Sequence, residues 1–173
     1  MKILLLIDSL GAGGAQRQLV GLAVMLKQHG YDVIVATYHD NRFYVDTILN
    51  AGVPYVYLKE GHNPYKRIWA VAKYIKRIKP NWVISYLETP SIIASLAHTF
   101  NHSFKLIVSE RNTTQMIGMN ERIRFFLFRS ANYVVPNAFA QEAFIINKFQ
   151  SLKNKTITIA NFVDTDIFTP ILH

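Results

Sequence analysis

A glycine-rich loop near the beginning of the chain has the residue types and spacing that suit chemistry on an anion. Gly11, Gly13 and Gly14 follow the apolar run 3–7, and Arg17 stands one turn into the amphipathic helix that comes next. Glycine lets the backbone approach a ligand closely, and the amide groups at a helix N-terminus favour negative charge. The loop therefore predicts a site for an anion such as a diphosphate. A tight strand-to-helix turn without a ligand is the alternative interpretation.

The same loop begins like the G-x-G-x-x-G fingerprint of dinucleotide-binding proteins, because Gly11 and Gly13 have the right spacing. Gln16 stands where the third glycine belongs. The second predicted strand ends in residues 38–40, which do not cleanly supply the acidic residue that would bind a ribose. A nicotinamide cofactor is therefore disfavoured.

The composition is that of one globular domain with an excess of positive charge. Half of the 173 residues are hydrophobic, which argues against disorder, and no apolar run reaches the roughly 18 residues of a membrane span. Asp8 and the glycine loop interrupt the first apolar run where a signal peptide would have its cleavage region, so we expect the chain in the cytoplasm. The absence of cysteine excludes disulfides and thiolate metal sites, and the net charge of +8 favours an anionic partner.

Predicted strands and helices alternate along the whole chain. After the run 3–7, apolar and β-branched residues predict further strands, and apolar residues at helical spacing predict helices between them. These further strands are expected at 32–38, 53–58, 82–86, 105–109, 133–135 and 156–160. Such alternation is typical of right-handed βαβ crossovers. We expect residues 1–173 to form one doubly wound α/β domain, with a mostly parallel, Rossmann-like sheet of about seven strands in the order 3-2-1-4-5-6-7 and helices on both faces.

Ligands of such sheets bind beyond the carboxyl ends of the strands, where the strand order reverses. This rule selects five loops, at residues 8–17, 88–89, 110–112, 137 and 161. We expect Asp8 to orient the glycine loop by accepting hydrogen bonds from its amides. Glu88 and Glu110 lie on neighbouring loops, which alone does not make them an acid-base pair for hydrolysis.

Three segments of the chain resemble those of GT4-type glycosyltransferases of the GT-B fold. Residues 13–17, Gly-Gly-Ala-Gln-Arg, are similar to the family's G-G-A-E-R loop, with Gln16 in place of the common glutamate. Residues 109–112, Ser-Glu-Arg-Asn, resemble an S-E-R-N segment beyond the fifth strand, and residues 160–168 resemble the N-G-V-D-x-x-x-F segment that closes the family's first domain. Phe162 replaces the usual glycine or proline there.

The resemblance implies a retaining glycosyltransferase whose active site lies between two such domains. This sequence would be the N-terminal, acceptor-side domain, inactive alone. The C-terminal domain with the E-x7-E motif, which this chain lacks, would hold the nucleotide-sugar donor. The acceptor would be a glycan or a lipid-linked molecule. The resemblance implies substrate-binding roles for Gly13, Gly14, Arg17, Glu110, Arg111 and Asn112.

The resemblance assigns no catalytic residue and implies no cofactor. The six histidines look like separate helix-end or loop residues, so we also expect no metal ion. Two other functions remain open: a stand-alone module that binds a nucleotide, a phosphate or a polyanion, and the first domain of a sugar-nucleotide epimerase. Basic residues are spread along helices without a nucleic-acid-binding motif, so we expect no nucleic-acid partner.

The segment 120–129, Asn-Glu-Arg-Ile-Arg-Phe-Phe-Leu-Phe-Arg, predicts a helix that combines apolar residues with arginines. We expect Ile123, Phe126 and Leu127 to cover the sheet, and Phe125 and Phe128 to extend the apolar surface beyond it. Together with the basic helix 64–79, this segment could hold the domain peripherally at the anionic inner face of a membrane. A buried helix with snorkelling arginines is the interpretation that we favour.

Overall fold

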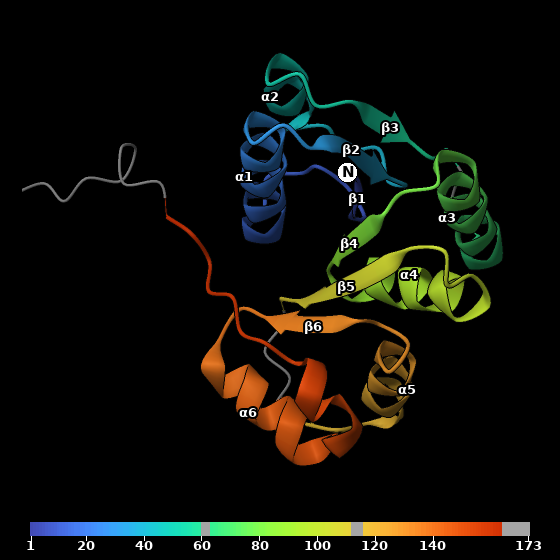
Figure 1. Cartoon of the computed structure of the whole chain (residues 1–173), viewed down its shortest axis with the longest axis vertical. Helices are drawn as coiled ribbons and strands as arrows, with labels where there is room; N and C mark the ends of the chain where they lie inside the picture. Colours follow the sequence, from blue (N-terminus) through green and yellow to red (C-terminus); the bar gives the residue numbers. More distant parts are fainter. Residues whose placement is uncertain (60–62, 112–115, 164–173) are drawn as a thin grey trace, which may run out of the picture.

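The computed structural model describes residues 1–59, 63–111 and 116–163. Over these residues a six-stranded sheet lies between layers of helices (Figure 1), and every neighbouring pair of strands is parallel. The strands are β1 (Lys2–Leu6), β2 (Asp32–Thr37), β3 (Tyr55–Tyr57), β4 (Trp82–Tyr86), β5 (Lys105–Glu110) and β6 (Tyr133–Pro136). Their order, β3-β2-β1-β4-β5-β6, confirms the expected doubly wound α/β fold.

The helices are α1 (Gly14–Gln28), α2 (Val45–Asn50), α3 (Pro64–Ile78), α4 (Glu88–Phe100), α5 (Met119–Phe128) and α6 (Phe139–Lys148), and a 3-10 helix, η1 (Gln150–Lys155), follows α6. Figure 1 shows α1 and α2 on one side of the sheet and α3, α4 and α5 on the other. None of the described helices is long and apolar enough to cross a membrane.

Strand β1 is the centre of the core because both of its faces are covered. Leu4 and Leu6 belong to the cluster under α3, α4 and α5, while Ile3 and Leu5 belong to the cluster under α1 and α2. A strand covered on both faces requires a continuous apolar run, which is the pattern that predicted it.

The seventh strand expected at 156–160 is present only as an isolated bridge. Thr156 pairs in parallel with Val134, and the amides of Ile157 and Ile159 donate to Val134 and Pro136 at 3.0 Å each. The segment thus lies at the expected edge, beside β6. Its isoleucine side chains are exposed, so burial does not hold it in a longer ladder.

The inward face of α5 differs from the predicted one. Phe125 and Phe128 are each 1% exposed, whereas Ile123 and Phe126 are 52% and 64% exposed. The expectation that Ile123 and Phe126 cover the sheet was therefore wrong. The reason is Arg124, which lies on the buried face in ion pairs with carboxylates of two other loops. These pairs fix the rotation of the helix.

Two phenylalanines of α5 test this rotation. Phe128→Ala should lower the free energy of unfolding by about 3–5 kcal/mol because it opens a cavity in the core, and Phe126→Ala should change it by only about 0.5 kcal/mol. Urea denaturation of both variants measures the difference. A larger loss for Phe126→Ala would mean that the helix is rotated as the spacing alone predicted.

Candidate functional site

A crevice of about 310 Å³ opens where the strand order reverses, at the carboxyl ends of β1, β2 and β4. Its walls come from the loop after β1, the end of β2, the first turn of α3 and the turn that begins α4. The lining residues are Asp8, Tyr38, His39, Arg67, Leu87, Glu88, Thr89 and Pro90. The sheet topology predicts a ligand site at this place.

The crevice combines carboxylates with a guanidinium and a buried phenol. Burial raises the pKa of Tyr38 well above its ordinary value, with a smaller contribution from Asp8 and an opposing one from Arg67. The Arg67 guanidinium lies 4.6 Å from the centre of the Tyr38 ring. The Tyr38 hydroxyl is buried, with the Arg67 side chain beside it. It therefore stays protonated at neutral pH and suits binding rather than proton abstraction.

Asp8 lies at the beginning of the glycine loop, but its carboxylate does not accept the glycine amides that were expected to bind it. Its carboxylate accepts the Ser9 amide at 2.6 Å and the Gln16 side-chain amide at 3.5 Å. Its carbonyl oxygen accepts the amides of Tyr38 and His39, which ties the loop to the end of β2. The amide that the carboxylate binds is that of Ser9 rather than of a glycine.

The two glycines of the predicted anion site leave space above the N-terminus of α1. Gly13 is the N-cap residue, with an extended φ of −136°, and Gly14 begins the helix. A Cβ at Gly14 would meet no described atom within 4 Å, and one at Gly13 would meet only the flexible end of Gln16. The described residues therefore do not require a glycine at either position. A ligand lying on the backbone would explain both.

The turn that begins α4 is strained. Leu87 has φ 72° and ψ 166°, a conformation found almost only in glycine, which costs about 1–3 kcal/mol in other residues. Such strain clusters at ligand sites because the surrounding structure must hold it. Here it places Glu88 at the crevice.

A buried guanidinium joins the loops after β4 and β5. Nη1 of Arg124 lies 3.0 Å from Oε2 of Glu88 and 3.6 Å from Oε1 of Glu110. Glu110 is buried, whereas Glu88 is partly exposed toward the crevice. Both carboxylates could be named from the sequence, whereas their connection through Arg124 could not. The place of Arg124 between Ile123 and Phe125 in the sequence was the available signal.

Arg111 connects three parts of the ligand edge. Its Nε donates to Ser109 Oγ at 2.7 Å, its Nη1 donates to Asn161 Oδ1 at 2.6 Å, and its guanidinium lies 4.4 Å from the centre of the Tyr86 ring. The structure thus brings Arg111 and Asn161 together. Arg17 is exposed on the first turn of α1. Asn112, the remaining predicted site residue, lies outside the described residues.

The segment after η1 docks on α1, and sequence reasoning missed the residues that hold it. The buried Gln18 side chain donates to the Phe162 carbonyl at 2.8 Å and accepts the Phe162 amide at 3.0 Å. The Phe162 ring occupies the place that a Cβ at Gly21 would take. The chain consequently runs past β6 toward α1 (Figure 1). We name Gln18, Gly21 and Phe162 the exit clip.

Gly21→Ala should break the exit clip because the added methyl collides with the Phe162 ring. We expect chymotrypsin to cut after Phe162 on the order of tenfold faster, as a lost contact of about 1.4 kcal/mol would give. Limited proteolysis measures this directly. The unfolding free energy is a poorer readout because alanine also stabilises a helix interior.

The matched control for this experiment is Gly14→Ala, in the same helix with open space around the new methyl. It should leave the cleavage rate unchanged. Equal rates for Gly21→Ala and the parent chain would contradict the exit clip.

Known proteins share this fold over almost the whole chain. The family model of Glycosyltransferase Family 4 matches residues 12–167. HepE from Anabaena in complex with UDP superposes with a TM-score of 0.77 at 19% identity, over 96% of this chain and 46% of HepE. A glycosyltransferase from Rickettsia africae gives a TM-score of 0.76 at 15% identity, over 96% of this chain and 45% of that one.

Epimerases have the same fold. UDP-GlcNAc 2-epimerase from Neisseria meningitidis bound to UDP-GlcNAc superposes with a TM-score of 0.71 at 16% identity, over 93% of this chain and 47% of the epimerase. The chain thus spans less than half the length of each of these three proteins. A search of curated protein sequences finds no match.

Proposed function

Because this chain belongs to Glycosyltransferase Family 4, we propose that it is the acceptor-binding part of an enzyme that moves a sugar from a nucleotide-sugar donor to a glycan or a lipid-linked acceptor. The observation that carries the proposal is the crevice at the strand-order reversal. It lies between the glycine loop and the strained turn of α4, at the edge where such sheets bind ligands.

A second domain completes the enzyme in this proposal. The chain covers less than half of HepE, and HepE has been crystallised with UDP and with UDP-glucose. We propose that a second α/β domain with an E-x7-E motif follows and holds the nucleotide sugar. The two domains would enclose the reaction, and transfer would retain the configuration of the sugar.

The glycine loop contributes to the donor side of the reaction. Gly13 and Gly14 would let the diphosphate or the sugar lie on the backbone of α1, with Arg17 nearby. Amide groups and positive charge stabilise the diphosphate as it leaves. Glu110, Arg111 and Asn112 would contribute from the loop after β5.

The crevice contributes to the acceptor side. Asp8 and Glu88 are hydrogen-bond acceptors for the hydroxyl groups of a sugar, and Arg67 and Tyr38 are donors. A volume of about 310 Å³ is at the small end of ligand pockets, as suits the terminal unit of a larger acceptor. With a lipid-linked acceptor the enzyme would work in the cytoplasm, at the inner face of the membrane.

A sugar-nucleotide epimerase is the second candidate, favoured by the shared fold of the Neisseria enzyme. The two functions differ in a simple assay. A transferase releases the nucleotide only when an acceptor is present, whereas an epimerase changes the sugar of the nucleotide sugar without any acceptor. Activity of the 173-residue chain alone in either assay would show that the donor site is wrongly placed in a second domain.

Gly14→Val in the complete enzyme tests the loop. We expect kcat/KM for sugar transfer to fall about 10²–10³-fold, as for the loss of a transition-state hydrogen bond, because the branched side chain keeps the donor off the backbone. The open space around this position predicts little change in the unfolding free energy of the 173-residue chain. Steady-state kinetics and urea denaturation give the two readouts. Unchanged turnover would remove the loop from the mechanism.

A further inference from the structure

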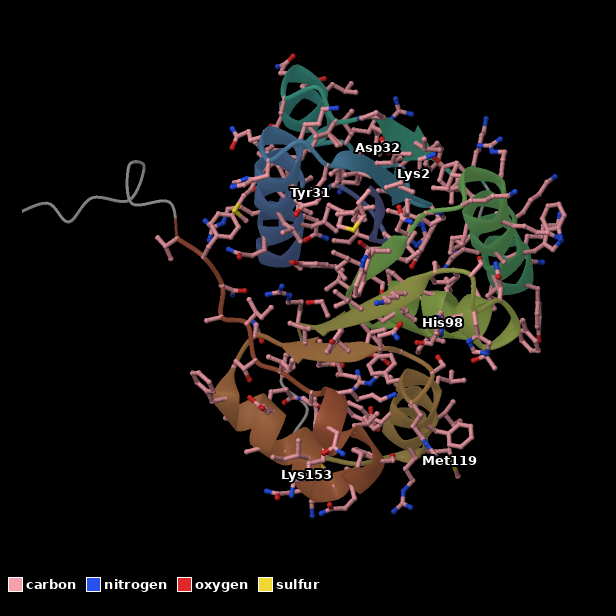
Figure 2. The ribbon with its side chains drawn as sticks, viewed as in Figure 1. Lys2, Tyr31, Asp32, His98, Met119 and Lys153 are labelled. Carbon is pink, nitrogen blue, oxygen red and sulfur yellow. The ribbon has the colours of Figure 1, made fainter. Side chains whose placement is uncertain are left out.

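The outer face of α3 and α4 exposes three aromatic rings. Tyr65 and Trp69 on α3 are 82% and 60% exposed, and Phe100 at the end of α4 is 87% exposed. A groove of about 980 Å³ runs between the two helices, and the half-buried Ala72 and Leu96 line it together with Trp69 and Phe100. Figure 2 shows the side chains of α3 reaching away from the sheet. We name this the α3–α4 face.

Lysines surround the apolar part of the α3–α4 face. Lys73, Lys76 and Lys79 line the same groove, and Nζ of Lys73 lies 4.5 Å from the centre of the Trp69 ring. Residues 61–109 contain seven lysines and arginines but a single acidic residue, Glu88. Glu88 lies at the crevice, in an ion pair with Arg124. The charge of the α3–α4 face is therefore of one sign.

We propose that the α3–α4 face docks on an anionic lipid bilayer. Tryptophan and tyrosine favour the boundary between head groups and acyl chains, and lysines keep their apolar stems in that boundary while their charges reach anionic head groups. Each basic side chain near such a surface contributes about 1 kcal/mol. The aromatic rings of α3 and α4 and the lysines between them therefore match a bilayer, whose apolar acyl chains lie beneath anionic head groups.

The α3–α4 face adjoins the crevice, which connects it with the proposed function. Arg67 on α3 and Pro90 on α4 line the crevice, and Ile68 and Trp69 begin the groove one residue further along α3. A lipid-linked acceptor could therefore keep its lipid in the bilayer while its sugar enters the crevice. This link rests on the proposed function, whereas membrane docking does not require it.

Part of the predicted membrane segment 120–129 is buried, while its Arg122 and Arg129 stay exposed. Arg124 of α5 is 2% exposed and held by Glu88 and Glu110, so it is not available to head groups. Phe125 and Phe128 are buried as well. The exposed Ile123 and Phe126 of α5 provide a comparison surface beside α4.

Co-sedimentation of the 173-residue chain with vesicles of phosphatidylcholine and increasing phosphatidylglycerol tests the proposal. Binding should rise with the anionic fraction and fall with added salt. Replacing Lys73, Lys76 and Lys79 by glutamine should weaken binding on the order of 100-fold, from about 1 kcal/mol for each lysine. The matched control replaces Lys27, Lys148 and Lys153, which are exposed on α1, α6 and η1. Equal losses in the two triple variants would overturn the proposal.

The aromatic part is tested by Trp69→Ser with Phe100→Ser, against Ile123→Ser with Phe126→Ser on α5. Only the first pair should abolish binding.

Fluorescence quenching tests whether Trp69 enters the bilayer. The chain has two tryptophans, so Trp82→Phe leaves Trp69 as the only fluorescent tryptophan, and brominated lipids should quench its emission. The proposal would be overturned if the lipids did not quench Trp69 or if the chain did not bind vesicles at low salt. Equal binding to polyglutamate would also overturn it, in favour of an acidic protein partner. None of these measurements depends on sugar transfer, so their failure leaves the proposed function in place.

Discussion

The ligand edge of this domain depends on one buried charge. Arg124 is almost fully enclosed, and an unpaired guanidinium there would cost several kcal/mol. Glu88 and Glu110 come from two different loops to pair with it. The three residues thereby fix the rotation of α5, the beginning of α4 and the end of β5 relative to one another. Removing one partner of such a group typically costs about 3–5 kcal/mol, because the others stay buried.

This dependence explains where sequence reasoning succeeded and where it failed. The strand order followed from local signals, since continuous apolar runs that alternate with helices have few arrangements. The inward face of α5 could not be predicted from local signals, because Phe125 and Phe128 fit an apolar helical stripe as well as Ile123 and Phe126 do. The buried face of α5 is determined by the carboxylates of Glu88 and Glu110, which are 36 and 14 residues away from Arg124 along the chain.

The residues of the candidate site also fall into those that the sequence could predict and those that it could not. Asp8, the glycine loop and the loop after β5 could be found from their place at the ends of predicted strands. Gln18 could not, because a polar residue in an amphipathic helix is ordinarily taken as solvent-facing. Its partner, Phe162, follows 144 residues later. The net charge predicted an anionic partner, yet the crevice itself carries two carboxylates, and much of the positive charge lies along α3 instead.

The exit clip has a consequence for how such domains vary. Phe162 fills the space above Gly21, and Gln18 binds its backbone. A glycine or proline at position 162 would leave that space empty and would tolerate a larger residue at position 21. The two positions should therefore covary among homologous sequences, one small where the other is large. Gln18 binds only the backbone of residue 162, so it can hold the same chain direction for any residue there that has an amide proton. A proline would keep the carbonyl contact and lose the amide contact.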